Sequence, residues 1–194
     1  GIGAAANSIL NQFYAIRDQS FQNSFSVSTQ DFPIDWAGKQ STGRNIIGIL
    51  SGTEVGGGVI VLGAHYDSTS YDFNDGNAYA PGANDNASGV SALIEIARIM
   101  SQRRHRATIM FVAFSAEEIQ RRGSVTFVRD YLQGGDNNID VTAMINMDII
   151  GSRTGPNGEI NDRQIRLYSG DTFSANANNS RSRQLARMLH LVSS

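Results

Sequence analysis

The sequence of 194 residues contains no cysteine, only three prolines and a single lysine, Lys39. Without cysteine, disulfides and thiolate metal sites are excluded, so any bound metal must use histidine, aspartate and glutamate side chains. Only three histidines are available for that purpose. No apolar run approaches the ~20 residues that a membrane-spanning helix needs, so we expect no membrane partner.

The composition is that of a globular chain without a strongly charged partner. Hydrophobic residues make up 40% of the sequence, charged residues make up 18%, and the formal net charge is −2. This balance gives no reason to expect a nucleic-acid partner. The length suits one domain with a sizeable core, so we predict a single domain over residues 1–194. No signal peptide is visible in the chain.

Hydrophobic periodicity predicts helices that alternate with short apolar strands. A helical spacing of apolar residues predicts a helix over 5–17, and alternation over 25–29 predicts a half-buried strand. The apolar runs 45–50 and 58–64 flank a glycine-containing loop that we expect to turn a hairpin. The later predicted elements are a helix after Asp85, a strand at 107–114, a helix capped by Ser124, strands at 141–150 and 164–169, and a helix at 182–193. The pattern favours an α/β fold with a mixed, centrally parallel sheet and helices on both faces.

Acidic residues and one histidine follow the predicted strands at the points where they give way to loops. These residues are His65 and Asp67, Asp85, Glu117 and Glu118, and Asp148. In open α/β sheets the carboxyl ends of neighbouring parallel strands meet at one edge, where ligands bind. Five carboxylates in one cleft would repel one another, and a divalent metal is the usual remedy.

Carboxylates and imidazole are suitable zinc ligands, and a carboxylate can bridge paired ions about 3.5–4 Å apart. Each residue alone has a simpler interpretation, since Asp85 and Asn86 are also good N-cap residues for the following helix. The joint placement of the acids is what favours a two-metal site.

Four sequence motifs carry a family resemblance. They are Gly63-Ala64-His65-Tyr66-Asp67-Ser68, the run from Pro81 to Gly89, Ala116-Glu117-Glu118 with Gly123-Ser124, and Asn146-Met147-Asp148. In this order and spacing they resemble the M28 family of zinc aminopeptidases and carboxypeptidases. The resemblance implies a zinc-exopeptidase-like, phosphorylase/hydrolase-like α/β/α sandwich that acts on peptide substrates. It also implies a secreted or periplasmic location, and we expect a monomer.

The resemblance assigns a role to each residue of the cluster. It implies that His65, Asp85 and Asp148 bind one zinc and that Asp85 bridges to a second zinc held by Glu118. Glu117 is implied to be the general base and later the acid.

The resemblance also assigns Asp67 and one peptide bond. Asp67 would orient His65 without binding metal, as acids hydrogen-bonded to ligand histidines commonly do. The peptide bond between Asp85 and Asn86 is implied to be cis.

The last zinc ligand of the family is a histidine well downstream of Asp148, and neither remaining histidine suits that role. His105 lies at the start of a predicted strand, at the wrong edge, and His190 lies off the apolar stripe of the last helix. We therefore interpret the chain as a catalytic domain that lacks its C-terminal portion. Its second zinc site would lack a ligand, so residues 1–194 alone are expected to bind one zinc more tightly than two and to have little activity.

The sequence supports a zinc exopeptidase that removes N-terminal residues, and it leaves two alternatives open. The first is a single-zinc activity of a glutaminyl-cyclase-like or carboxypeptidase type. The second is a non-catalytic binding domain or an inactive fragment that keeps the peptidase fold.

Overall fold

The structure is a computed structural model that describes residues 2–70, 72, 78–134, 138–155, 157–161, 163–170 and 180–193. The chain divides into two compact units, Gly1–Gly151 and Ser152–Ser194. In the part of the chain that the structure describes, no helix is both long and apolar enough to cross a membrane.

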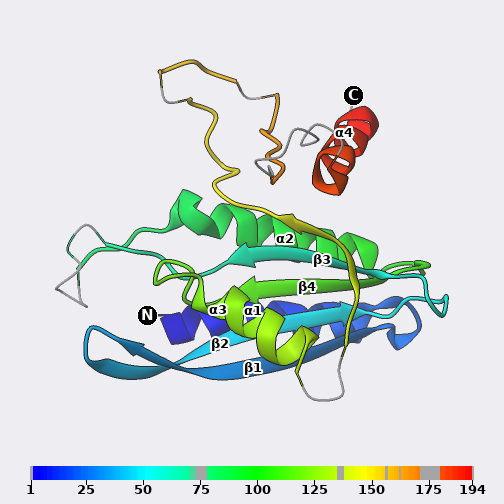
Figure 1. Cartoon of the computed structure of the whole chain (residues 1–194), viewed down its shortest axis with the longest axis horizontal. Coiled ribbons are helices and arrows are strands. Elements are labelled where there is room, and N and C mark those ends of the chain that lie inside the picture. Colours follow the sequence, from blue (N-terminus) through cyan, green and yellow to red (C-terminus); the bar gives the residue numbers. More distant parts are fainter. Residues whose placement is uncertain are drawn as a thin grey trace. The chain divides into compact units, whose positions relative to one another are not determined.

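The first unit is built on a five-stranded sheet (Figure 1). The strand order is β1-β2-β4-β3-β5, and the bounds are β1 Phe25–Trp36, β2 Lys39–Leu50, β3 Val59–His65, β4 Thr108–Phe114 and β5 Val141–Asn146. Strands β4, β3 and β5 are parallel to one another, while β2 is antiparallel to both β4 and β1. The predicted mixed, centrally parallel sheet is confirmed.

Helices cover both faces of this sheet, as the sequence predicts. On one face, α1 (Ile2–Gln19) and α2 (Ser88–Met100) bury Phe13 and Leu93 against the strand residue Phe111. On the other face, α3 (Arg122–Thr126) and the helical turn η3 (Phe127–Leu132) bury Phe127 against Val112. Because β4 lies between β2 and β3 and is covered on both faces, its side chains from Ile109 to Phe114 are all buried.

The expected hairpin between residues 45–50 and 58–64 is wrong. Strand β2 instead forms a hairpin with β1, and β4 lies between β2 and β3. Apart from Asn45, both runs are continuously apolar, which is typical of strands that are covered on both faces. The more buried β4 takes the central place and hydrogen-bonds to both.

A predicted cap, a predicted strand end and a predicted strand also need correction, and β1 and β2 are longer than the predicted 25–29 and 45–50. Ser124 does not cap its helix, because α3 begins at Arg122, so Ser124 lies inside the helix and its hydroxyl donates to the carbonyl of Arg121, the N-cap residue. Strand β5 ends at Asn146 rather than at residue 150, which frees Asp148 from the sheet. Residues 164–169 are not a strand, and the exposed Ile165 and Leu167 show that their alternation marks no buried face.

The second unit contains the predicted C-terminal helix as α4 (Arg181–Ser193). On α4, Leu185 and Leu189 are half-buried, whereas Met188, His190 and Val192 are exposed. An isolated antiparallel bridge joins Thr154 to Ile160 earlier in the same unit.

Candidate metal centre

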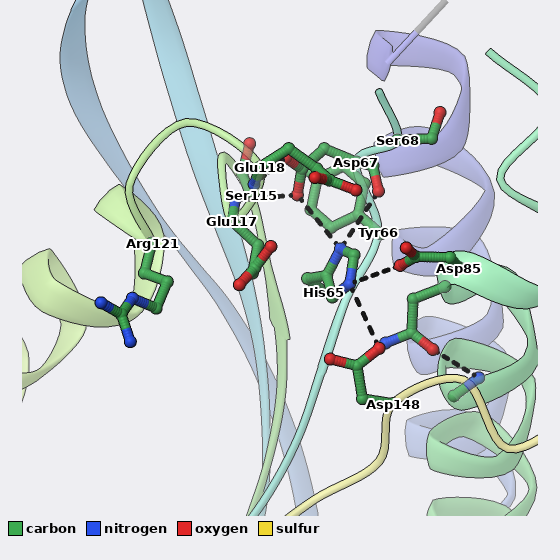
Figure 2. A network of polar contacts seen from close by, with 12 residues as sticks. His65, Tyr66, Asp67, Ser68, Asp85, Ser115, Glu117, Glu118, Arg121 and Asp148 are labelled. Atoms are coloured by element: carbon green, nitrogen blue, oxygen red, sulfur yellow. Dashed lines mark hydrogen bonds and ion pairs between the residues drawn. The ribbon is translucent and has the colours of Figure 1, made fainter. Parts of the chain in front are cut away.

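The parallel strands bring the predicted site residues to one edge of the sheet (Figure 2). His65 is the last residue of β3, Glu117 and Glu118 follow β4, and Asp148 follows β5. Asp85 lies in the helical turn η2 (Ala83–Ala87), just before α2. Residues as far apart in the sequence as 65 and 148 therefore meet because each follows the carboxyl end of a neighbouring strand or begins the next helix.

His65 is at the centre of this group and is 3% exposed. Its Nε2 lies 3.1 Å from Asp85 Oδ1 and 3.5 Å from Asp148 Oδ1. Its Nδ1 lies 3.1 Å from the backbone oxygen of Asp67. When the neutral ring donates its Nδ1 proton to this oxygen, the lone pair of Nε2 points at the two carboxylates and is free to bind a metal.

The pKa of His65 shows how much negative charge surrounds it. Burial alone would lower this pKa, but the charges of Asp67, Asp148 and Glu117 outweigh burial and raise it to about 9. In the metal-free protein a proton on His65 therefore occupies the place that a cation would take.

Asp67 is a buried carboxylate that joins the ends of β3 and β4. Its Oδ1 accepts the backbone N–H of Glu117 at 3.0 Å and its Oδ2 accepts that of Glu118 at 3.1 Å. Burial alone would raise the pKa of Asp67. Contact with His65 and the two N–H groups lowers this pKa by more, so the net shift is downward. The Asp67 carboxylate is 3.6 Å from His65 Nδ1, too far for a hydrogen bond, so the direct hydrogen bond to the ring involves the backbone oxygen of Asp67.

The loop after β4 carries the two glutamates in a tightly folded turn. Ala116 has a φ of 59°, and the N–H groups of Arg121 and Arg122 donate to the carbonyls of Glu117 and Ala116 at 2.7 and 2.9 Å. Both glutamates are half-buried. Burial and the charges of Asp85 and Glu117 raise the pKa of Glu118, as expected of a carboxylate among like charges.

Asn45, which the sequence did not single out, hydrogen-bonds to residues on both sides of this loop. It is fully buried in β2, its amide donates to the carbonyl of Gly123 at 2.9 Å, and its Oδ1 accepts the N–H of Ser115 at 3.1 Å. The available signal was a polar residue beginning the apolar run Asn45-Ile46-Ile47, since a buried amide must be hydrogen-bonded.

The predicted cis peptide bond between Asp85 and Asn86 is present. Neither Asp85 nor Asn86 is the N-cap residue of α2, which is Ala87, but the Asn86 side chain still bonds to the first turn of the helix. Asn86 Oδ1 accepts the N–H of Gly89 at 3.1 Å, whereas Asp85 directs its carboxylate to His65 (Figure 2).

Within the described residues, ligand atoms gather in two sets, each within 4.8 Å, that could hold a metal ion. One set is His65, Asp85 and Asp148, which is the set predicted for the first zinc. The other is His65, Glu117 and Glu118, so Asp85 and Glu118, the pair predicted to hold the second zinc, fall in different sets. Nitrogen and carboxylate donors of this kind suit zinc. His105 lies outside both sets, and its Nε2 is 2.9 Å from the carbonyl of Met100 at the opposite edge. His190 lies on α4 in the second unit.

Comparison with protein families identifies the chain. The model of peptidase family M28 matches residues 45–188, which include every residue of the cluster. The chain belongs to peptidase family M28.

Two fungal relatives illustrate the match to M28 proteins. A probable zinc metalloprotease from Pyricularia oryzae is 40% identical over 124 residues, covering 64% of this chain and 24% of that protein. Another from Pyrenophora tritici-repentis is 30% identical over 213 residues, covering 100% of this chain and 48% of that protein. The chain thus spans about a quarter of the first of these M28 relatives and about half of the second.

Solved structures resemble the M28 chain over most of its length. A glutaminyl cyclase from an Acidobacteriales bacterium aligns with a TM-score of 0.54 and 26% identity, over 74% of this chain and 48% of that one. A putative zinc-dependent exopeptidase from Bacteroides vulgatus aligns with a TM-score of 0.56 and 23% identity, over 77% of this chain and 51% of that one. The second likeness supports the fold alone.

Proposed function

We propose that this M28 chain carries the catalytic centre of a zinc exopeptidase that removes N-terminal residues from peptides. The observation that carries the proposal is the meeting of His65, Asp85 and Asp148 with Glu117 and Glu118 at one sheet edge. His65, Asp85 and Asp148 would hold one zinc. Glu118 would hold a second zinc, with Asp85 between the two.

The division of labour follows from the chemistry of peptide hydrolysis. Zinc, when bound, polarises the scissile carbonyl and acidifies the attacking water. Glu117 takes a proton from that water as its oxygen bonds to the carbonyl carbon, and passes the proton to the amine nitrogen as the C–N bond breaks. Asp67 accepts hydrogen bonds from the backbone of both glutamates and so holds the loop that carries Glu117 next to the end of β3.

The test uses the zinc-loaded protein at its full length, not residues 1–194 alone, and the substitution Glu117→Gln, which removes the base but keeps the size of the side chain. We expect hydrolysis of an unblocked leucine peptide to fall by ~10²–10⁴-fold in kcat, with zinc content unchanged. Glu95→Gln is the matched control, because Glu95 is an exposed glutamate on α2 that pairs with Arg98. A near-normal rate for Glu117→Gln would refute the assignment.

The likeness to a glutaminyl cyclase supports one rival activity, cyclisation of an N-terminal glutamine at a single zinc. Peptides beginning with leucine or glutamine, and peptides with a blocked carboxyl end, separate the candidates. Release of N-terminal leucine from the blocked peptide supports the aminopeptidase. Ammonia release from the glutamine peptide with one zinc bound supports the cyclase, and loss of activity on blocking supports a carboxypeptidase.

A further inference from the structure

The loop that carries Asp148 is held by side chains from the segment that carries Asp85. Three consecutive backbone N–H groups after Asp148 each donate to a side chain rather than to another strand. Ile149 N donates to Asn86 Oδ1 at 3.3 Å, Ile150 N to Ser88 Oγ at 3.2 Å, and Gly151 N to Asn84 Oδ1 at 2.9 Å. These side chains alternate along residues 84, 86 and 88, and we call them the 84/86/88 clamp.

The clamp also grips the residue before Asp148. The Asn86 amide donates to the carbonyl of Met147 at 2.9 Å, while its Oδ1 also accepts the N–H of Gly89. Asn86 is 1% exposed, so its hydrogen bonds are made within the protein. One side chain therefore bonds on both sides of Asp148.

The two segments are closely packed where they meet, and the backbone of Ile149 is strained. A Cβ placed on Gly89 would lie 2.4 Å from the carbonyl oxygen of Met147 and 2.5 Å from Asn86 Oδ1. Ile149 has a φ of 50°, a conformation that costs a β-branched residue free energy and persists only where its surroundings impose it. The hydrogen bonds of the 84/86/88 clamp are those surroundings.

The clamp joins two segments that each carry a negatively charged residue of the site. Asp85 and Asp148 direct their carboxylates at the same His65 nitrogen, and their side chains are 49% and 43% exposed (Figure 2). A carboxylate oxygen of Asp85 lies within 4.8 Å of one of Asp148, and two negative charges this close repel one another when no cation is bound. Asp85 lies inside the clamp segment and Asp148 lies inside the loop that the clamp grips, so the clamp opposes their separation.

We propose that Asn86, assisted by Asn84 and Ser88, is a positioning residue that fixes Asp148 against Asp85 so that the pair with His65 is ready to receive zinc. The inference rests on the proposed function of the site. It adds a role for three residues that do not themselves bind the metal. Preorganised ligands raise metal affinity because less free energy is spent in assembling them.

The competing explanation is that Asn86 only bonds to the first turn of α2 through Gly89, and Asn86→Ser separates the two. Serine is a good cap residue and adds no charge, but it is too short to bridge both Gly89 and Met147. We expect Asn86→Ala to lower both stability and zinc affinity. We expect Asn86→Ser to regain only the part of the stability that comes from the acceptor for Gly89, because the Met147 carbonyl still lacks the Asn86 amide. We expect its zinc affinity to stay ~10–100-fold below that of the unsubstituted protein.

Two further variants keep the test decisive if Asn86 variants fold poorly. Asn84→Ala removes the acceptor for Gly151 N without touching the cap of α2, and we expect it to weaken zinc binding severalfold. Ser91→Ala is the matched control, because the exposed Ser91 hydroxyl donates to the carbonyl of Ala87 at the same end of α2. We expect its zinc affinity to be unchanged.

The measurement is a zinc titration against a competing chelator, paired with denaturant unfolding of the metal-free protein. If Asn86→Ser regains zinc affinity together with stability, or if Asn84→Ala binds zinc as well as Ser91→Ala does, the clamp role is overturned. If the unsubstituted protein binds no zinc, the proposed function fails and the clamp role fails with it. Zinc binding and peptide hydrolysis by the unsubstituted protein, with unaltered affinity in the variants, would overturn the clamp alone.

Discussion

Removing the Asp67 carboxylate should damage both stability and metal binding, and the structure supplies the magnitude. Asp67 accepts two backbone N–H groups, those of Glu117 and Glu118, and is 8% exposed. A hydrogen bond to a charged group contributes ~1.5–3 kcal/mol. Because the glutamates are half-buried, water can partly replace the lost acceptor in Asp67→Ala. We therefore assign about 1.5 kcal/mol, the lower end of that range, to each of the two hydrogen bonds, and expect Asp67→Ala to lower the free energy of unfolding by about 3 kcal/mol.

Zinc affinity should fall in the same variant. Without the carboxylate, the loop that carries Glu117 and Glu118 loses its attachment to the end of β3, and His65 loses a negative neighbour at 3.6 Å. Loss of such a supporting acid usually weakens metal binding by ~10–100-fold.

The pH dependence of this contribution has a definite sign. The pKa of Asp67 is lowered in the folded protein, because contact with His65 and the two N–H groups outweigh burial. A lowered carboxyl pKa stabilises the fold above the ordinary value near 3.8 and loses that effect as pH falls through the folded value. The gap in stability between the unsubstituted protein and Asp67→Ala should thus be full at neutral pH and close below about pH 4.

Asp31→Ala is a matched control for Asp67→Ala. Asp31 also accepts two hydrogen bonds, at 2.6 and 2.7 Å from Arg44, but its side chain is 45% exposed. An exposed pair of this kind contributes only ~0–1 kcal/mol. Denaturant unfolding and zinc titration of both variants form the assay. Equal losses for Asp31→Ala and Asp67→Ala, or an unchanged zinc affinity in Asp67→Ala, would show that burial and attachment to the glutamate loop do not matter.

Two other predictions concern His65 and Asn45. The pKa of metal-free His65 is about 9 and only the neutral ring binds metal, so zinc affinity should rise with pH up to about pH 9, by ~10-fold per pH unit for one released proton. Calorimetry in buffers of different ionisation enthalpy measures that proton release. A zinc affinity that does not change between about pH 6 and pH 8 would contradict this prediction. Asn45→Ala should leave the buried Ser115 N–H without its acceptor, whereas the Gly123 carbonyl keeps the N–H of Phe127. We expect a loss of about 2 kcal/mol in denaturant unfolding, and an unchanged unfolding free energy would contradict that reading.

The parts of the fold that could be predicted are those where apolar periodicity and strand ends decide the outcome. The helix around Phe13, the central strand β4 and the shared position of His65 and Asp148 follow from local pattern and from the geometry of parallel strands. Pairing order could not be predicted from these signals. The apolar runs of β2 and β3 look like hairpin partners until the more buried β4 is placed between them.

The supporting residues were harder to predict because their role depends on contacts between distant segments. Asn45 reaches Gly123, 78 positions away, and Asn86 reaches Met147, 61 positions away. No local pattern distinguishes such an asparagine from one that caps a helix. The metal roles of the cluster, the number of zinc ions, the single-domain boundary, the monomeric state and the secreted or periplasmic location stay predictions.

The charges of the site and its hydrogen-bonded supports form one system. His65 faces a group of carboxylates that raise its pKa, so the metal-free centre is held together partly by a proton. When zinc replaces that proton, the electrostatic attraction persists but the ligand geometry becomes stricter, because zinc prefers a tetrahedral arrangement. A proton on His65 cannot impose that geometry on Asp85 and Asp148, whereas hydrogen bonds to the backbone on both sides of Asp148 can. The buried Asn86 side chain, with its bonds to Met147, Gly89 and Ile149, thus has a reason for its place: before a metal is bound, it holds an arrangement from which the repulsion between the two acids would displace them.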